Sequence, residues 1–184
     1  LKLQTGSTES IHYFKEGRRI GMEIGNDFRV TVGDMVLATN YHLLNQPDSA
    51  LLFALEGEKY GKQGGITKYL SYIWGVMGNI YRQKGNDSLA LSYYQKSLQY
   101  AIPEGNYTVV AGTYESLIDF YQSKGNADSL LFYATKNLPV IQSLGAVTSS
   151  VSGDVNPGIA YQHLATAYSL KNNTDSSNKY LQLA

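Results

Sequence analysis

The chain has 184 residues, of which 43% are hydrophobic, so it is long enough to bury a continuous core. Fifteen basic residues balance fifteen acidic ones, and this neutral balance argues against a general attraction to nucleic acid or an anionic membrane. The chain contains no cysteine, which excludes disulfides and thiolate chemistry. No stretch approaches the roughly 18 apolar residues of a membrane span, so we predict no inserted segment.

Four tyrosines recur at steps of 40, 40 and 47 in the numbering, and each is followed four residues later by an asparagine or a glycine. An Asp-Ser pair comes shortly after each of these turn residues, so an aromatic residue, a helix stop and a helix start recur together. The tyrosines and their turn residues are Tyr41 and Asn45, Tyr81 and Gly85, Tyr121 and Gly125, and Tyr168 and Asn172. The pattern predicts a stack of repeats, an architecture that usually binds other molecules.

Each repeat is expected to be a pair of antiparallel helices, with the recurrent tyrosine in the interior between them. In the second repeat, Trp74, Met77, Gly78 and Tyr81 share one helix face, and Asp87 or Ser88 is expected to cap the next helix. Residues that break helices are expected to separate the units at 25–26, 61–65 and 103–106. The predicted helices span residues 8–24, 27–45, 47–61, 65–84, 87–102, 107–124, 128–144, 157–170 and 174–184.

We predict a single array that covers residues 1–184. A linker near 145–156 contains the seven extra residues of the third step, and it is either a flexible insertion or an extension over the concave side. The chain begins at Leu1 without an initiator methionine, so we expect a piece of a longer protein. The predicted divisions are a partial repeat at 1–25, repeats at 26–64, 65–104 and 105–145, a longer linker at 146–156 and a last repeat at 157–184.

The second repeat resembles the tetratricopeptide repeat, whose signature begins W-x-x-L-G-x-x-Y. The residues that carry the resemblance are Trp74, Met77, Gly78, Tyr81, Gly85, Ala90 and Tyr94. The period of 40 departs from the family's period of about 34, and Leu130 and Ser177 stand where a small alanine is usual. The resemblance implies an all-α solenoid of helix pairs that binds a protein or peptide and has no catalytic activity of its own.

Patterns that would indicate a cofactor or metal are weak. His12, His42 and His163 lie in different repeats without the short spacings of a metal motif, so we predict no metal and no cofactor. The segment 57–62 has two glycines and a lysine, as a phosphate loop does, but it has only three residues between the glycines and no following Ser or Thr. We therefore predict an ordinary turn there.

In arrays of this family the first helix of each pair lines a concave groove, so the resemblance implies a polar groove here. Asn79 and Arg82 could hold a carboxylate or a peptide backbone, or Arg82 could pair with Glu115 or Asp119 in a solvated network. The family's clamp for a C-terminal carboxylate uses more basic and asparagine positions than this chain has. The candidate groove residues are His42, Tyr72, Asn79, Arg82, Glu115, Asp119, Gln122 and Gln162.

The tyrosine-rich, cysteine-free repeats also resemble sensor regions of bacterial signalling proteins, especially histidine kinases of Bacteroidetes. This resemblance implies a periplasmic or extracytoplasmic segment of a membrane-anchored protein, with any catalytic activity outside this chain. A homodimer could form through an exposed end of the array. The alternatives are the repeat domain of a cytoplasmic transcription regulator and an accessory carbohydrate-binding domain.

Overall fold

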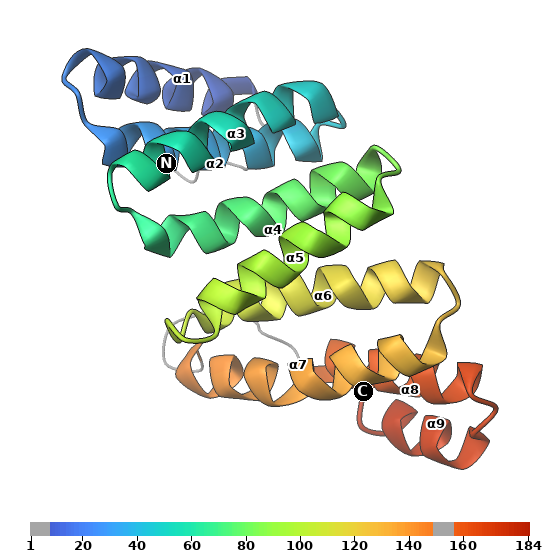
Figure 1. Cartoon of the computed structure of the whole chain (residues 1–184). Coiled ribbons are helices and arrows are strands. Elements are labelled where there is room, and N and C mark those ends of the chain that lie inside the picture. Colours follow the sequence, from blue (N-terminus) through green and yellow to red (C-terminus); the bar gives the residue numbers. More distant parts are fainter. Residues whose placement is uncertain (1–7, 149–156) are drawn as a thin grey trace. The chain divides into compact units, whose positions relative to one another are not determined.

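The computed structural model describes residues 8–148 and 157–184, and every regular element in these ranges is a helix (Figure 1). This confirms the predicted all-α class. The chain forms two compact units, of which the first ends at Glu104 and the second begins at Gly105. The first unit contains α1 (Thr8–Glu23), α2 (Asp27–Leu43), α3 (Pro47–Gln63), α4 (Thr67–Gln83) and α5 (Asp87–Ala101). The second contains α6 (Tyr107–Ser123), α7 (Ala127–Thr148), α8 (Pro157–Leu170) and α9 (Thr174–Leu181).

Within each unit, helices that follow one another in sequence pack side by side (Figure 1). The tightest pairs are α2 with α3, α4 with α5, and α6 with α7, and α4 also packs against both helices of the preceding pair. Apolar residues from α2, α3 and α4 form one continuous cluster around Trp74, which is 1% exposed. Within each unit, neighbouring helix pairs therefore cover apolar surface that the other leaves open, as in an all-α solenoid of repeats.

The hydrogen bonds of the turn that follows each recurrent tyrosine explain why the turn residue comes four residues after the tyrosine. After Tyr81, the Asn86 N–H donates to the Tyr81 carbonyl at 2.9 Å, and the Gly85 N–H donates to the Arg82 carbonyl at 3.0 Å. Gly85 adopts a φ of 75°, which residues with a β-carbon rarely tolerate. Equivalent bonds follow Tyr41, Tyr121 and Tyr168. The tyrosine thus occupies the third position from the helix end in a Schellman motif.

The prediction that Asp87 or Ser88 caps α5 was wrong. Asn86 itself is the N-cap, and its side chain accepts the backbone N–H of Leu89 at 3.1 Å. One asparagine therefore both closes the preceding turn and starts the next helix. Residues with positive φ recur at even intervals from Gly25 to Gly125, twice in each repeat. Each repeat therefore consists of two helix-and-turn units of equal length.

Each recurrent tyrosine stacks on an aromatic ring twelve residues later, a partnership that the sequence pattern did not reveal. The ring centroids are 5.4 Å apart for Tyr41 and Phe53 and for Tyr81 and Tyr93, and the interplanar angles are 1° and 5°. Similar stacks join Tyr121 to Tyr133 and Tyr168 to Tyr180. All eight rings are half-buried. The stack therefore joins the two helices of each pair at the margin of the core. The sequence pattern places these tyrosines in the interior, so their position differs from the prediction.

Two helices extend past their predicted ends. The predicted turn at 57–62 was wrong, because α3 continues to Gln63. Gly61 lies inside this helix, where an added Cβ would be 2.7 Å from Cδ2 of Leu70, so this glycine permits a close helix contact. The other helix, α7, continues to Thr148, past the predicted end at 144. The rest of the predicted linker, 149–156, lies outside the described residues.

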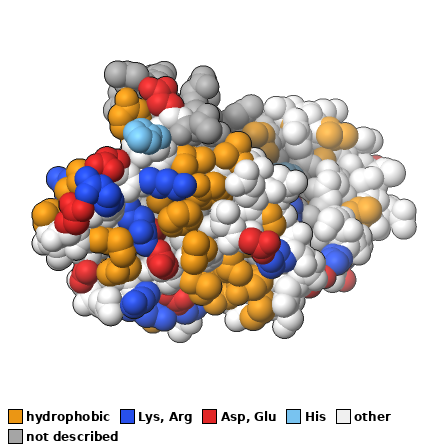
Figure 2. All heavy atoms as spheres, turned by 90° about the horizontal axis from the view of Figure 1, so that it is seen from above, with side chains coloured by type: hydrophobic (Ala, Val, Ile, Leu, Met, Phe, Trp, Pro, Cys, Tyr) orange, Lys and Arg blue, Asp and Glu red, His pale blue; other side chains and the backbone are white. Residues whose placement is uncertain are grey.

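The surface offers no uniform charge on the face that Figure 2 shows. Lys and Arg side chains lie interspersed with Asp and Glu, and hydrophobic side chains occur between them (Figure 2). Among the described residues, no helix combines the length and the apolar character that a membrane span requires.

We predict that Gly78→Ala destabilises the protein and that Gly112→Ala does not. A Cβ at Gly78 would lie 2.4 Å from two ring carbons of the fully buried Tyr94, whereas a Cβ at Gly112 would meet no other helix of the described chain within 4 Å. Overpacking should cost about 1–3 kcal/mol at Gly78, while alanine at the helical Gly112 should gain up to about 1 kcal/mol. Urea unfolding of both variants tests this, and equal midpoints would contradict the packing assigned to Gly78.

Candidate functional site

Three of the predicted groove residues meet at one pocket in the first unit. His42 on α2 and Asn79, Arg82 and Gln83 on α4 line a pocket of about 250 Å³. Both helices contribute residues from their C-terminal halves, which lie together because α4 packs against α2. The pocket therefore forms between the first helices of two successive pairs, where the resemblance placed the groove.

His42 is held by a short chain of polar side chains. Its Nδ1 lies 3.0 Å from Oε1 of Gln83, and the Gln83 amide nitrogen donates to Oδ1 of Asn45 in the turn after α2. Because an amide oxygen accepts hydrogen bonds, this arrangement places the imidazole proton on Nδ1 and leaves Nε2 as an acceptor. Gln83 and Asn45 were not predicted as site residues. Both are exposed polar residues, and no motif in the sequence distinguishes them from other polar residues.

Asn79 is oriented by a residue from the second helix of the same pair. Its Oδ1 accepts a hydrogen bond of 2.7 Å from the hydroxyl of Tyr94, whose side chain is fully buried. The amide NH₂ group of Asn79 is then the part left to contact a ligand. Together with the guanidinium of the half-buried Arg82, it makes this wall of the pocket rich in hydrogen-bond donors.

Tyr72 does not join this pocket. It is half-buried and packs against the apolar cluster around Trp74. Its ring therefore contributes to the core of the first unit, although the groove pattern included it among the binding candidates.

The second unit contains a different polar cluster around Glu115 on α6. Asn137 on α7 donates to Glu115 Oε1 at 2.6 Å, and Nδ1 of His163 on α8 lies 3.4 Å from Glu115 Oε2. Burial raises the pKa of Glu115, and the negative charge of Asp119 acts in the same direction, while His163 and Asn137 oppose it. Asn137 is completely buried. The cluster thus ties three helices together, and Glu115 serves the structure at least as much as the groove.

The other predicted groove residues of the second unit remain on the surface. Asp119, Gln122 and Gln162 are exposed. The negative charge of Asp119 helps to raise the pKa of Glu115, another of the candidates. His163 and Asn137 were missed as partners of Glu115, because their positions on separate helices give no local motif.

The described residues contain no group of three or more His, Cys, Asp or Glu side chains placed to hold a metal ion. Comparison with known proteins finds no family model that matches the chain and no curated protein that matches its sequence. The pocket presents hydrogen-bond donors and one imidazole acceptor, held by two packed helices.

The bond between Asn79 and Tyr94 generates a prediction for this site. Tyr94→Phe keeps the ring and removes the donor, and Asn79→Ala removes the acceptor, so a double-mutant cycle should give a coupling of about 1 kcal/mol. Urea unfolding of the wild type, the two single variants and the double variant measures it. Strict additivity of the two effects would show that the bond does not orient Asn79.

Proposed function

We propose that the chain is a non-catalytic repeat domain that binds a protein or peptide segment through the first helices of its pairs. The observation that carries this proposal is the convergence of His42, Asn79, Arg82 and Gln83 on one pocket. Three of these residues are groove candidates implied by the resemblance to the tetratricopeptide repeat, and they come from two helices that belong to successive pairs.

The chemistry of the pocket suits a peptide group. The Asn79 amide and the Arg82 guanidinium can donate to a carbonyl oxygen, and Nε2 of His42 can accept an N–H. Because Tyr94 and Gln83 already hold two of these side chains in place, little side-chain freedom would be lost on binding. This supports recognition of an extended main chain.

The wider context of the proposal comes from the repeat pattern. The tetratricopeptide-like signature and the helix pairs support a domain of that kind, and such arrays present long binding surfaces. We further propose that it serves as the sensor or interaction segment of a larger bacterial signalling protein of the histidine kinase type. A periplasmic or extracytoplasmic location belongs to that proposal.

Selection from a displayed library of random nine-residue peptides against the chain of residues 1–184 tests the binding function. We expect enriched peptides to bind Arg82→Gln at least about tenfold more weakly than wild type, a loss of about 1.4 kcal/mol. The matched control is Arg29→Gln, since Arg29 is exposed at the opposite end of α2 from His42.

Two outcomes would contradict the proposal. One is the absence of any enriched peptide with measurable affinity by isothermal titration. The other is an enriched peptide that binds Arg82→Gln and the wild type equally well, because such a peptide would use another surface.

A further inference from the structure

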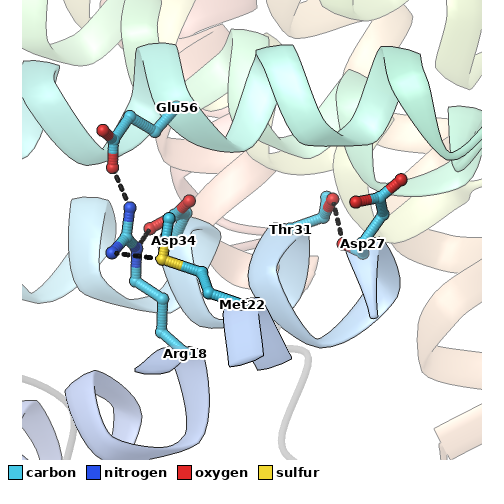
Figure 3. Close-up of polar contacts among 6 residues, drawn as sticks. All are labelled: Arg18, Met22, Asp27, Thr31, Asp34 and Glu56. Carbon is cyan, nitrogen blue, oxygen red and sulfur yellow. Dashed lines mark hydrogen bonds and ion pairs between the residues drawn. The ribbon is translucent and has the colours of Figure 1, made fainter. Parts of the chain in front are cut away.

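A charged junction joins the first three helices of the chain. Arg18 projects from α1 and binds both Asp34 on α2 and Glu56 on α3 (Figure 3). The Asp34 side chain is completely buried, and its second oxygen, Oδ2, has no hydrogen-bond partner among the described residues. Burial raises the pKa of Asp34 to about 7, against the opposing influence of Arg18. Arg18 is therefore the cation on which this buried carboxyl group depends.

A second junction joins α3, α4 and α5. Oε1 of Glu58 on α3 accepts a 2.8 Å bond from Nε1 of Trp74 on α4 and a 2.9 Å bond from Nζ of Lys96 on α5. Burial acts to raise the pKa of Glu58, but the bonds from Lys62, Lys96 and Trp74 prevail and hold it at about 2. Glu58 is therefore a stable anion at the centre of this junction.

The two junctions occupy the same three positions of the repeat with opposite charge. One full repeat period separates Arg18 from Glu58, Asp34 from Trp74, and Glu56 from Lys96. The first junction has a central cation between two acceptors. The second has a central anion with donors at the two corresponding positions and a third donor, Lys62, on its own helix.

A nearby aromatic contact is also common to both junctions. Arg18 lies 5.7 Å from the ring centre of Phe53, and Lys96 lies 5.7 Å from that of Tyr93. Phe53 and Tyr93 occupy equivalent positions in successive repeats. The second junction has a further ring, because Nζ of Lys96 also lies 4.2 Å from the ring centre of Trp74, at the position that Asp34 holds in the first. The two junctions therefore differ in the polarity of their charges and in the Trp74 ring.

The corresponding central position in the later repeats is apolar. Leu98 and Leu138 stand one and two periods after Glu58. Leu138 packs against the apolar cluster of α6, α7 and α8 together with Tyr161. The central positions of the repeats thus include a cationic, an anionic and an apolar type.

A slip by one repeat would place incompatible groups together. If α3 of a second copy took the place of α1, its Glu58 would face Asp34 and Glu56, which puts three carboxyl groups in one partly buried site. If α1 took the place of α3, Arg18 would face Lys96 and the Trp74 N–H with no acceptor between them. Such arrangements leave buried charges without compensation, which is strongly unfavourable.

We propose that the reversed polarity of the two junctions specifies which helix docks on which pair. The surface of Asp34, Glu56 and Phe53 accepts α1, whose matching position is a cation, and it rejects α3 of a second copy. Helices of 16 and 17 residues with equal spacing could otherwise exchange places between two copies of the chain. The charges thus specify the order in which the helices dock, which their similar lengths do not specify.

The test uses the full chain and the single variant Glu56→Lys, which sets a lysine opposite Arg18. Amide hydrogen exchange in α1 should become at least about tenfold faster, because this helix loses its docking site. The triple variant R18E/D34N/E56K gives the first junction the polarity of the second. It should restore α1 exchange to within about threefold of wild type, since a central anion again lies between donors.

The same triple variant tests the encoding of order, because its two junctions now have the same charge polarity. After dilution from urea it should yield dimers that increase with protein concentration, measured by size-exclusion chromatography with light scattering, whereas the wild type should refold to one species. The matched control exchanges the exposed pair Asp48 and Lys84, as D48K/K84D, and should behave like wild type. Unchanged α1 exchange in Glu56→Lys, unrestored exchange in the triple variant, or refolding of the triple variant to one species like wild type would each overturn the proposal.

Discussion

The structure depends on how each helix ends. A tyrosine in the third position from the helix end and a residue with positive φ recur together, and after three of the four tyrosines an asparagine then caps the next helix. The geometry reverses the chain within three residues and brings the ring twelve residues later onto the tyrosine, at 5.4 Å for Tyr81 and Tyr93. Local hydrogen bonds thus set the turn, and the aromatic stack fixes the angle and depth at which the second helix returns.

The candidate site follows from this repeated geometry. Because α2 and α4 pack together and end at equivalent positions of the repeat, side chains near their ends lie next to each other, as His42 and Gln83 do at 3.0 Å. The second helix of the pair supplies the support, since Tyr94 fills the space over Gly78 and holds Asn79. Binding capacity and packing therefore share residues in the first unit. In the second unit the equivalents of Asn79 and Arg82 are Asp119 and Gln122, which are exposed, and the polar cluster forms instead around Glu115.

The all-α class, the helix pairs and most helix ends could be predicted from the sequence, because turn residues and apolar spacing are local signals. His42, Asn79 and Arg82 were among the groove candidates because the resemblance to the tetratricopeptide repeat implies a groove along the first helices. Other features could not be predicted from the sequence. They are the ring partners Phe53 and Tyr93, the hydrogen bond from Tyr94, and the junctions of Arg18 and Glu58. Each depends on the side-chain direction of two or three separate helices, which periodicity alone does not specify. Gly61 was misread for a related reason, since a glycine that allows close packing looks in sequence like one that ends a helix.

Native-state hydrogen exchange on alanine variants of Phe53, Tyr93 and Tyr133 tests the central claim most directly. Each residue is the second ring of a stack with the same geometry, so each substitution should lower the opening free energy of its own helix pair by a similar amount. The loss expected for truncating such a ring is about 2–4 kcal/mol, somewhat below that of a fully buried one. Losses below about 0.5 kcal/mol, the range of ordinary surface changes, or a loss confined to one of the three pairs would contradict the account.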